Sequence, residues 1–182
     1  MFCNDETLFV VFMRRPGEES IVICAFTGHR PQRLPWGNRE EDSRCLALKQ
    51  LLGTAIDSVV ERGCRHLLCG MALGCDTYFA EAVVEKKKRV PDLILEAVLP
   101  CPGQADRWLA EECRRYEDLL LQCSCVTVLE DCYSEGCMLR RNRAMVERAD
   151  ILITVFDGKP GGTASTVSCA RQAGVELLPV WL

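Results

Sequence analysis

Three short segments combine glycine with residues that can bind an anion. They are Thr27-Gly28-His29-Arg30-Pro31, Gly70-Met71-Ala72-Leu73-Gly74-Cys75-Asp76 and Asp157-Gly158-Lys159-Pro160-Gly161-Gly162-Thr163. Glycine lets the backbone approach a ligand closely, and arginine donates hydrogen bonds to anionic groups. The chemistry that these segments favour is recognition of a phosphate by backbone amides and basic side chains. For the first segment alone, a surface loop whose Gly28 and Pro31 only shape a turn is an equally good interpretation.

The second and third segments each precede a predicted helix, whose first amides favour negative charge. Asp76 has the residue type of a helix N-cap, so we predict a cap there rather than a catalytic carboxylate. The second segment has no P-loop lysine, which argues against magnesium-dependent triphosphate hydrolysis. The third segment leads into Thr163-Ala164-Ser165-Thr166, a first turn of small and hydroxyl side chains without an acid. This turn leaves bare amides for an incoming phosphate and makes the third segment the strongest candidate.

A polar side chain interrupts the apolar stripe of the predicted helix over 136–148. Asn142 lies at the centre of the stripe that Met145 and Val146 help to form, with Arg141 and Arg143 on either side. A buried amide needs hydrogen-bond partners. Asn142 is therefore expected to tie down a neighbouring loop while Arg141 reaches the ligand. The alternative is a purely structural amide flanked by two solvent-exposed arginines.

Alternating strands and helices must position these segments. The predicted strands are 21–26, 66–69, 93–99, 125–129, 151–156 and 176–181, and the predicted helices are 40–62, 76–88, 104–122, 136–148 and 163–173. The strand segments are nearly continuous apolar runs, as in parallel strands that are covered on both faces. We therefore predict an α/β fold of the Rossmann-like, doubly wound type, with a mostly parallel sheet of six to seven strands and helices on both faces. In such sheets the ligand lies outside the carboxyl ends of the strands, where all three segments begin.

Length and composition narrow the functional classes. A chain of 182 residues suits a single domain, predicted over 21–182, with residues 1–20 as an N-terminal extension or an additional edge strand. The net charge of −4 argues against nucleic acid and anionic membranes as partners. Thirteen cysteines without an export signal are expected to be reduced thiols of a cytoplasmic protein. Their spacing does not match that of zinc ligands, so we expect no metal site.

Four motifs in this order carry a family resemblance: Thr27-Gly28-His29-Arg30-Pro31, Gly70-x-Ala72-x-Gly74-x-Asp76-x-x-x-Ala80-Glu81, Arg141-Asn142-Arg143-x-Met145-Val146 and Gly161-Gly162-Thr163-x-x-Thr166-Val167. Together they resemble the YpsA-like branch of the SLOG superfamily, which is named for its Smf/DprA and LOG relatives. The resemblance covers residues 21–182 and implies a Rossmann-like fold that binds nucleotides, nucleotide-sugars or related ligands. It also raises a homodimer as a candidate assembly.

The third segment departs from the enzymes of this superfamily. LOG-type phosphoribohydrolases carry a longer P-G-G-x-G-T-x-x-E motif, whereas Thr166 occupies the position of the glutamate here. Cleavage of a glycosidic bond generally uses carboxylates beside the reacting carbon. The leading hypothesis is therefore binding or sensing of a nucleotide or ADP-ribose-like ligand, with no other cofactor expected. A nucleoside-monophosphate phosphoribohydrolase using Asp76 or Asp157 is the alternative. Single-stranded DNA binding ranks below it, because stacking needs exposed aromatics in a basic groove, whereas this chain is acidic and only 7% aromatic.

Overall fold

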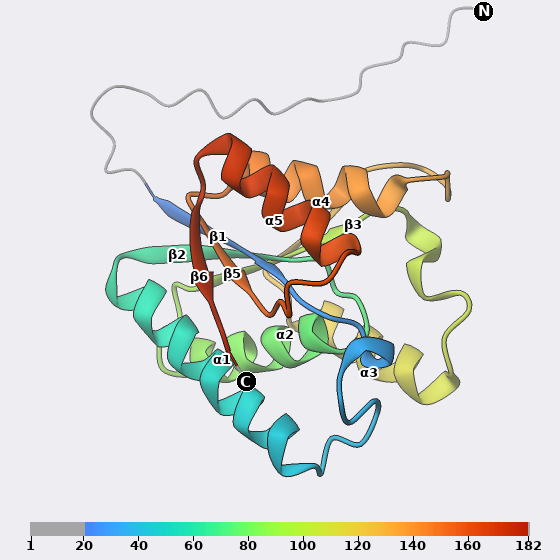
Figure 1. Ribbon diagram of the computed structural model, residues 1–182, viewed down its shortest axis with the longest axis horizontal. Helices are drawn as coiled ribbons and strands as arrows, with labels where there is room; N and C mark the ends of the chain where they lie inside the picture. Colours follow the sequence, from blue (N-terminus) through green and yellow to red (C-terminus); the bar gives the residue numbers. More distant parts are fainter. Residues whose placement is uncertain (1–20, 182) are drawn as a thin grey trace, which may run out of the picture.

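The fold is a single parallel sheet between two layers of helices (Figure 1). The computed structural model describes residues 21–181. Its strands are β1 (Val22–Thr27), β2 (Cys64–Cys69), β3 (Ile94–Leu99), β4 (Cys125–Val128), β5 (Ile151–Thr154) and β6 (Glu176–Pro179). They pair in the order β4-β3-β2-β1-β5-β6, and every pairing is parallel. The predicted fold class and all six strands of the described range are confirmed, whereas the edge strand proposed within residues 1–20 lies outside that range.

The helices cover the two faces of the sheet unequally. On one face lie α1 (Ser43–Glu61), α2 (Cys75–Lys87) and α3 (Ala110–Gln122), and on the other α4 (Cys137–Arg148) and α5 (Gly162–Ala173) (Figure 1). From β1 to β4 the chain steps in one direction across the sheet, and α4 then returns it to the other side of β1. The order of the sheet therefore reverses between β1 and β5, and ligands of open α/β sheets bind beyond the strand ends at such a point.

Burial follows the pattern that the sequence predicts for α1. Its inward face is fully or nearly fully buried and includes Cys45, Leu48, Leu52, Ala55 and Val59. The helix begins after Asp42, whose side chain accepts a hydrogen bond from the Arg44 amide at 2.9 Å. A large apolar core packs between the sheet and helices α1–α3. The conformation of the loops beyond the carboxyl edge of the sheet depends on their own contacts.

One predicted helix is wrong in extent. The segment 104–122 is divided into a 3₁₀ turn, η2 (Pro102–Ala105), and helix α3, which begins only at Ala110. Leu109 between them has an extended backbone, and the Glu112 carboxylate accepts a hydrogen bond from its amide at 2.9 Å. This capping contact starts a new helix in a segment whose apolar periodicity alone suggested a single one.

The described residues contain neither a membrane-spanning helix nor a disulfide bond. Within 21–181, no helix is both long enough and apolar enough to cross a membrane. The cysteines of this range are all free thiols, most of them buried. Cys24, Cys69 and Cys45 pack as small core residues, and burial raises the pKa of the Cys24 and Cys69 thiols.

Candidate functional site

The three glycine segments meet at the carboxyl edge of the sheet. They follow β1, β2 and β5, which are neighbours in the sheet, and hydrogen bonds connect them. Thr163 Oγ1 donates to the Gly28 carbonyl at 3.1 Å, so the first and third segments touch. The Cys75 amide donates to the His29 carbonyl at 3.1 Å and joins the second segment to the first. The first segment thus forms the centre of the site, with one neighbour on each side.

His29 is a buried link rather than an exposed ligand. Its side chain is buried, and Nε2 accepts a hydrogen bond from the Asp157 amide at 3.1 Å. The Asp157 carboxylate lies 3.1 Å from the same nitrogen, and the Lys159 amide holds the pKa of Asp157 below its usual value. His29 therefore fixes the path of the third segment. Thr27, also buried, accepts the Val155 amide through its carbonyl.

The two glycines of the second segment face the protein interior. A Cβ on Gly70 would lie 2.2 Å from Arg141 Nη1 and 2.9 Å from Asp76 Oδ2. A Cβ on Gly74 would lie 2.8 Å from the His29 carbonyl, and Gly74 also has a left-handed backbone with φ of 90°. Both positions require glycine because other parts of the chain fill the adjacent space. Their requirement for glycine is therefore structural.

Asp76 does not cap α2, contrary to the prediction. Gly74 occupies the N-cap position, and Asp76 lies within the first turn, almost fully buried. Its Oδ2 accepts the Ala72 amide at 3.2 Å, and Thr77 Oγ1 donates to the Ala72 carbonyl. Burial raises the pKa of Asp76, and the charge of nearby Arg141 opposes this rise. Because the cap must adopt a backbone that only glycine tolerates here, the carboxylate turns inward and holds the loop.

Arg141 and Asn142 connect α4 to the sheet, to the second segment and to α5. Arg141 is 3% exposed and donates to the Gly70 and Val98 carbonyls, the latter at 3.1 Å, while its Nε donates to Asn142 Oδ1 at 2.8 Å. Asn142 Nδ2 donates to Thr166 Oγ1 at 2.9 Å. The sequence predicts that Asn142 ties down a neighbouring loop, whereas this contact joins it to Thr166 within helix α5. Arg141 instead braces the second segment from inside the fold.

The start of α5 is the open part of the site. A Cβ on Gly162 would meet nothing within 4 Å, in contrast to Gly70 and Gly74. The first turn of α5 bears no acidic residue, and within the described chain no side chain caps it. Its amides carry the positive end of the helix dipole at the point where the strand order reverses. Of the three segments, the third therefore offers the accessible anion site.

Arg33, which the sequence analysis did not single out, completes this region. It belongs to η1 (Pro31–Arg33), and a Cβ on Gly161 would lie 2.9 Å from Arg33 Nη1. Arg30 precedes η1, and side chains three residues apart project from the same side of a 3₁₀ turn. Both arginines are exposed, and within residues 21–181 neither forms an ion pair. The sequence shows that Arg30 and Arg33 are three residues apart, but only the 3₁₀ turn places both side chains on the same side.

The position that carries glutamate in LOG-type enzymes is buried and occupied. Thr166 is 5% exposed and donates to the Gly162 carbonyl at 3.0 Å while accepting from Asn142. A carboxylate is therefore replaced by a hydroxyl whose hydrogen bonds are used inside the fold. The first turn of α5 can bind an anion, but its own side chains offer no general base or nucleophilic carboxylate.

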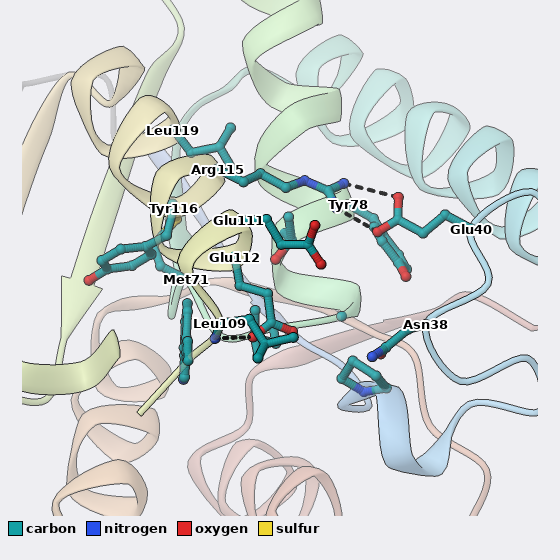
Figure 2. Close-up of a pocket in the computed structure, with 15 residues that line it drawn as sticks. Asn38, Glu40, Met71, Tyr78, Leu109, Glu111, Glu112, Arg115, Tyr116 and Leu119 are labelled. Carbon is teal, nitrogen blue, oxygen red and sulfur yellow. Dashed lines mark hydrogen bonds and ion pairs between the residues drawn. The ribbon is translucent and has the colours of Figure 1, made fainter. Parts of the chain in front are cut away.

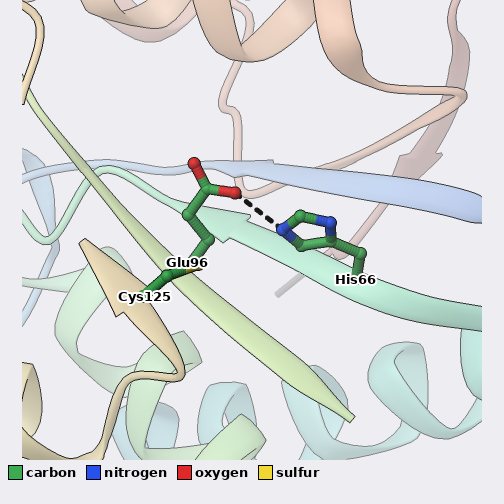
Figure 3. Close-up of side chains that lie close together, drawn as sticks. All are labelled: His66, Glu96 and Cys125. Atoms are coloured by element: carbon green, nitrogen blue, oxygen red, sulfur yellow. Dashed lines mark hydrogen bonds and ion pairs between the residues drawn. The ribbon is translucent and has the colours of Figure 1, made fainter. Parts of the chain in front are cut away.

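A second polar cluster lies elsewhere on the sheet. His66, Glu96 and Cys125, from three adjacent strands, place one potential metal-ligand atom each within 4.8 Å of one another (Figure 3). However, Glu96 accepts from His66 at 2.7 Å, from Thr127 at 2.7 Å, and from both Arg148 terminal nitrogens at 2.7 and 2.6 Å. Burial favours a higher pKa for Glu96, but these hydrogen bonds outweigh it and lower the pKa. Arg148 already supplies the positive charge, so the cluster is an ion-pair network.

Comparison with known proteins agrees with the geometry. Residues 24–174 match the model of the YspA SLOG family. The UPF0398 protein of Bacillus pumilus is 28% identical over 144 residues, covering 78% of this chain and 76% of the relative. The UPF0398 protein of Bacillus anthracis is 28% identical over 156 residues, covering 84% of each chain.

Two solved structures share the fold. DNA processing protein A from Helicobacter pylori, described for its single-stranded DNA binding mode, superposes with a TM-score of 0.58 at 17% identity. DprA from Streptococcus pneumoniae gives a TM-score of 0.60 at 14% identity. Each comparison covers 87% of this chain but only 64% and 50% of the respective DprA chain. At these identities the likeness shows a common fold.

Proposed function

This chain belongs to the YspA SLOG family, and we propose that it binds a nucleotide-type ligand whose phosphate rests on the first turn of α5. The ligand class comprises nucleotides, nucleotide-sugars and ADP-ribose-like molecules. The observation that carries the proposal is the open, uncapped turn at Gly162, placed where the order of the sheet reverses. Backbone amides and a helix dipole at such a point are a general solution to phosphate binding.

Charged side chains support the same region. Arg30 and Arg33 project from the loop after β1, and Arg33 lies against Gly161. Neither guanidinium is neutralised by a carboxylate of the described chain, so both can donate to phosphate oxygens. In this proposal the segments after β1 and β5 bind the phosphate, and the segment after β2 packs against the first segment without contacting the ligand.

Binding without hydrolysis fits the side chains better than catalysis does. Thr166 replaces the catalytic glutamate, and the nearby carboxylates Asp76 and Asp157 already have hydrogen-bond partners within the fold. A phosphoribohydrolase would release free adenine from AMP during prolonged incubation. We expect no adenine above the level found with an Asp76→Asn variant, and sustained release by the unmodified protein alone would restore the enzymatic hypothesis.

The binding test is a calorimetric titration with AMP, NAD and ADP-ribose. Gly162→Glu places a carboxylate where the phosphate is proposed to lie, so affinity should fall at least about tenfold, or about 1.4 kcal/mol. Gly53→Glu is a matched control, because Gly53 lies in α1 and a Cβ there also meets nothing within 4 Å. An affinity for all three compounds that is unchanged by Gly162→Glu would contradict the proposal, as would the absence of any binding.

Single-stranded DNA is the second candidate, supported by the fold shared with a DprA protein whose single-stranded DNA binding has been described. The same loops could hold a phosphate of a DNA strand. A gel-shift assay with an oligonucleotide across a salt series separates the two ideas, since contacts to several phosphates give a steep salt dependence. Tight, salt-sensitive binding of the oligonucleotide and none of the mononucleotides would favour DNA.

A further inference from the structure

A cavity of about 280 Å³ opens beside the glycine segments and is not used by the proposed phosphate site. It lies between the first turns of α3, the start of α2 and the loop over 31–40 (Figure 2). Pro31 and Gly74 line it and also belong to the first and second segments. Pro31 lies between Arg30 and Arg33 of the proposed phosphate site, so the cavity adjoins that site along the loop after β1.

Aromatic rings form much of this cavity. Tyr78, Trp108 and Tyr116 line it, and the rings of Trp108 and Tyr116 meet edge to face with centroids 5.1 Å apart. The Tyr78 ring is already covered by Lys49, whose Nζ lies 4.8 Å from its centroid. Trp108 is only partly buried, and Tyr116 holds it by its edge contact. Of the three rings, Trp108 is the one best able to stack on a planar ligand.

The charged groups of the cavity exclude a phosphate. Glu40, Glu111 and Glu112 line it together with a single cation, Arg115. Arg115 is already paired with Glu40 at 2.5 Å, as Figure 2 shows. It is also paired with Glu81 at 2.7 Å. The cavity is therefore negative and rich in hydrogen-bond acceptors. Glu111 is exposed, and within residues 21–181 it forms no ion pair.

We infer that this cavity is the base-binding subsite of the ligand, a conclusion that rests on the proposed function. A nucleobase is flat, carries N–H donors that match carboxylates, and bears no negative charge. The occupant is the nucleoside end of an extended, ADP-ribose-like molecule, whose phosphates lie across Pro31 at the start of α5. Among the three ligand classes, this arrangement selects a molecule long enough to span both places.

The test titrates ADP-ribose, adenosine and ribose 5-phosphate into the protein and into two variants. Trp108→Ala should weaken ADP-ribose binding about tenfold or more and leave ribose 5-phosphate unchanged. Gly162→Glu should weaken both phosphate-bearing compounds. Trp181→Ala is the matched control, because Trp181 is exposed and does not line the cavity. If Trp108→Ala does not fold, Glu111→Ala replaces it with Glu117→Ala as control, since both lie exposed on α3.

The outcomes separate the two proposals. ADP-ribose binding that depends on Gly162 but is indifferent to Trp108 and Glu111 overturns the base subsite and leaves the phosphate site intact. Binding of adenosine and ADP-ribose that depends on Trp108 but ignores Gly162→Glu supports the subsite and overturns the phosphate site. An equal loss of ribose 5-phosphate in Trp108→Ala overturns the subsite. If none of the three compounds binds, both proposals fail.

Discussion

Replacing Gly70 by alanine should destabilise the whole domain, although this substitution adds only one methyl group. The added methyl group would lie 2.2 Å from Nη1 and 2.5 Å from Cζ of Arg141. That side chain is 3% exposed and donates to two carbonyls, those of Gly70 and Val98, so it has no route to solvent. Either the second segment or Arg141 must move.

The expected cost follows from the hydrogen bonds lost. A hydrogen bond from a charged donor contributes about 1.5–3 kcal/mol, so losing both from Arg141 removes about 3–6 kcal/mol. This is a large part of the roughly 5–15 kcal/mol that stabilises a typical domain. At about 2–4 °C per kcal/mol for a chain of this size, the melting temperature should fall by roughly 6–24 °C.

The assay is urea denaturation followed by circular dichroism, with Gly162→Ala as the matched control. A Cβ at Gly162 meets open space, and alanine is about 0.5–1 kcal/mol more favourable than glycine within a helix. The control should therefore be as stable as the original protein or slightly more stable. Adding Arg141→Met to Gly70→Ala should cost less than the sum of the single changes, because the clash partner is gone. Equal midpoints for Gly70→Ala and Gly162→Ala would refute the reasoning.

Three further outcomes follow from the contacts of the site and the sheet. Glu96→Gln should cost about 2–3 kcal/mol at neutral pH, measured by denaturation, by weakening the hydrogen bonds to Arg148. The pKa of Glu96 is lowered in the folded state, so its carboxylate should stabilise the original protein fully above pH about 4.5 and less as the pH falls further. The free energies of unfolding of variant and original should therefore converge in acid, and a difference that stays constant with pH would contradict this expectation. Asn142→Leu should cost about 1–3 kcal/mol through its lost bonds, whereas exposed Arg143→Ala should change stability by less than about 0.5 kcal/mol. Gly74→Ala should destabilise more than Gly162→Ala, because its φ of 90° is strained for alanine and its Cβ would meet the His29 carbonyl at 2.8 Å; similar melting temperatures for the two would rule this out.

The sequence by itself determined the fold class, the strands and the edge at which the glycine segments meet. Continuous apolar runs separated by periodic helices leave few arrangements other than a parallel, doubly wound sheet. Parallel strands place all their carboxyl ends together, so segments that follow β1, β2 and β5 share one edge. These properties depend on local pattern and chain connectivity, both of which can be seen along a single chain.

Only the tertiary structure decided which glycines are open to an incoming group and which are packed against other parts of the chain. Gly70 and Gly162 both belong to glycine segments that precede a predicted helix, yet the first lies against Arg141 and the second faces open space. The same packing turns Asp76 inward and brings Arg33 onto Gly161. The cavity beside Trp108 is formed by segments distant in the chain. Such roles depend on which side chains fill the space at each backbone position, and that is settled by packing between elements rather than by residue type or spacing.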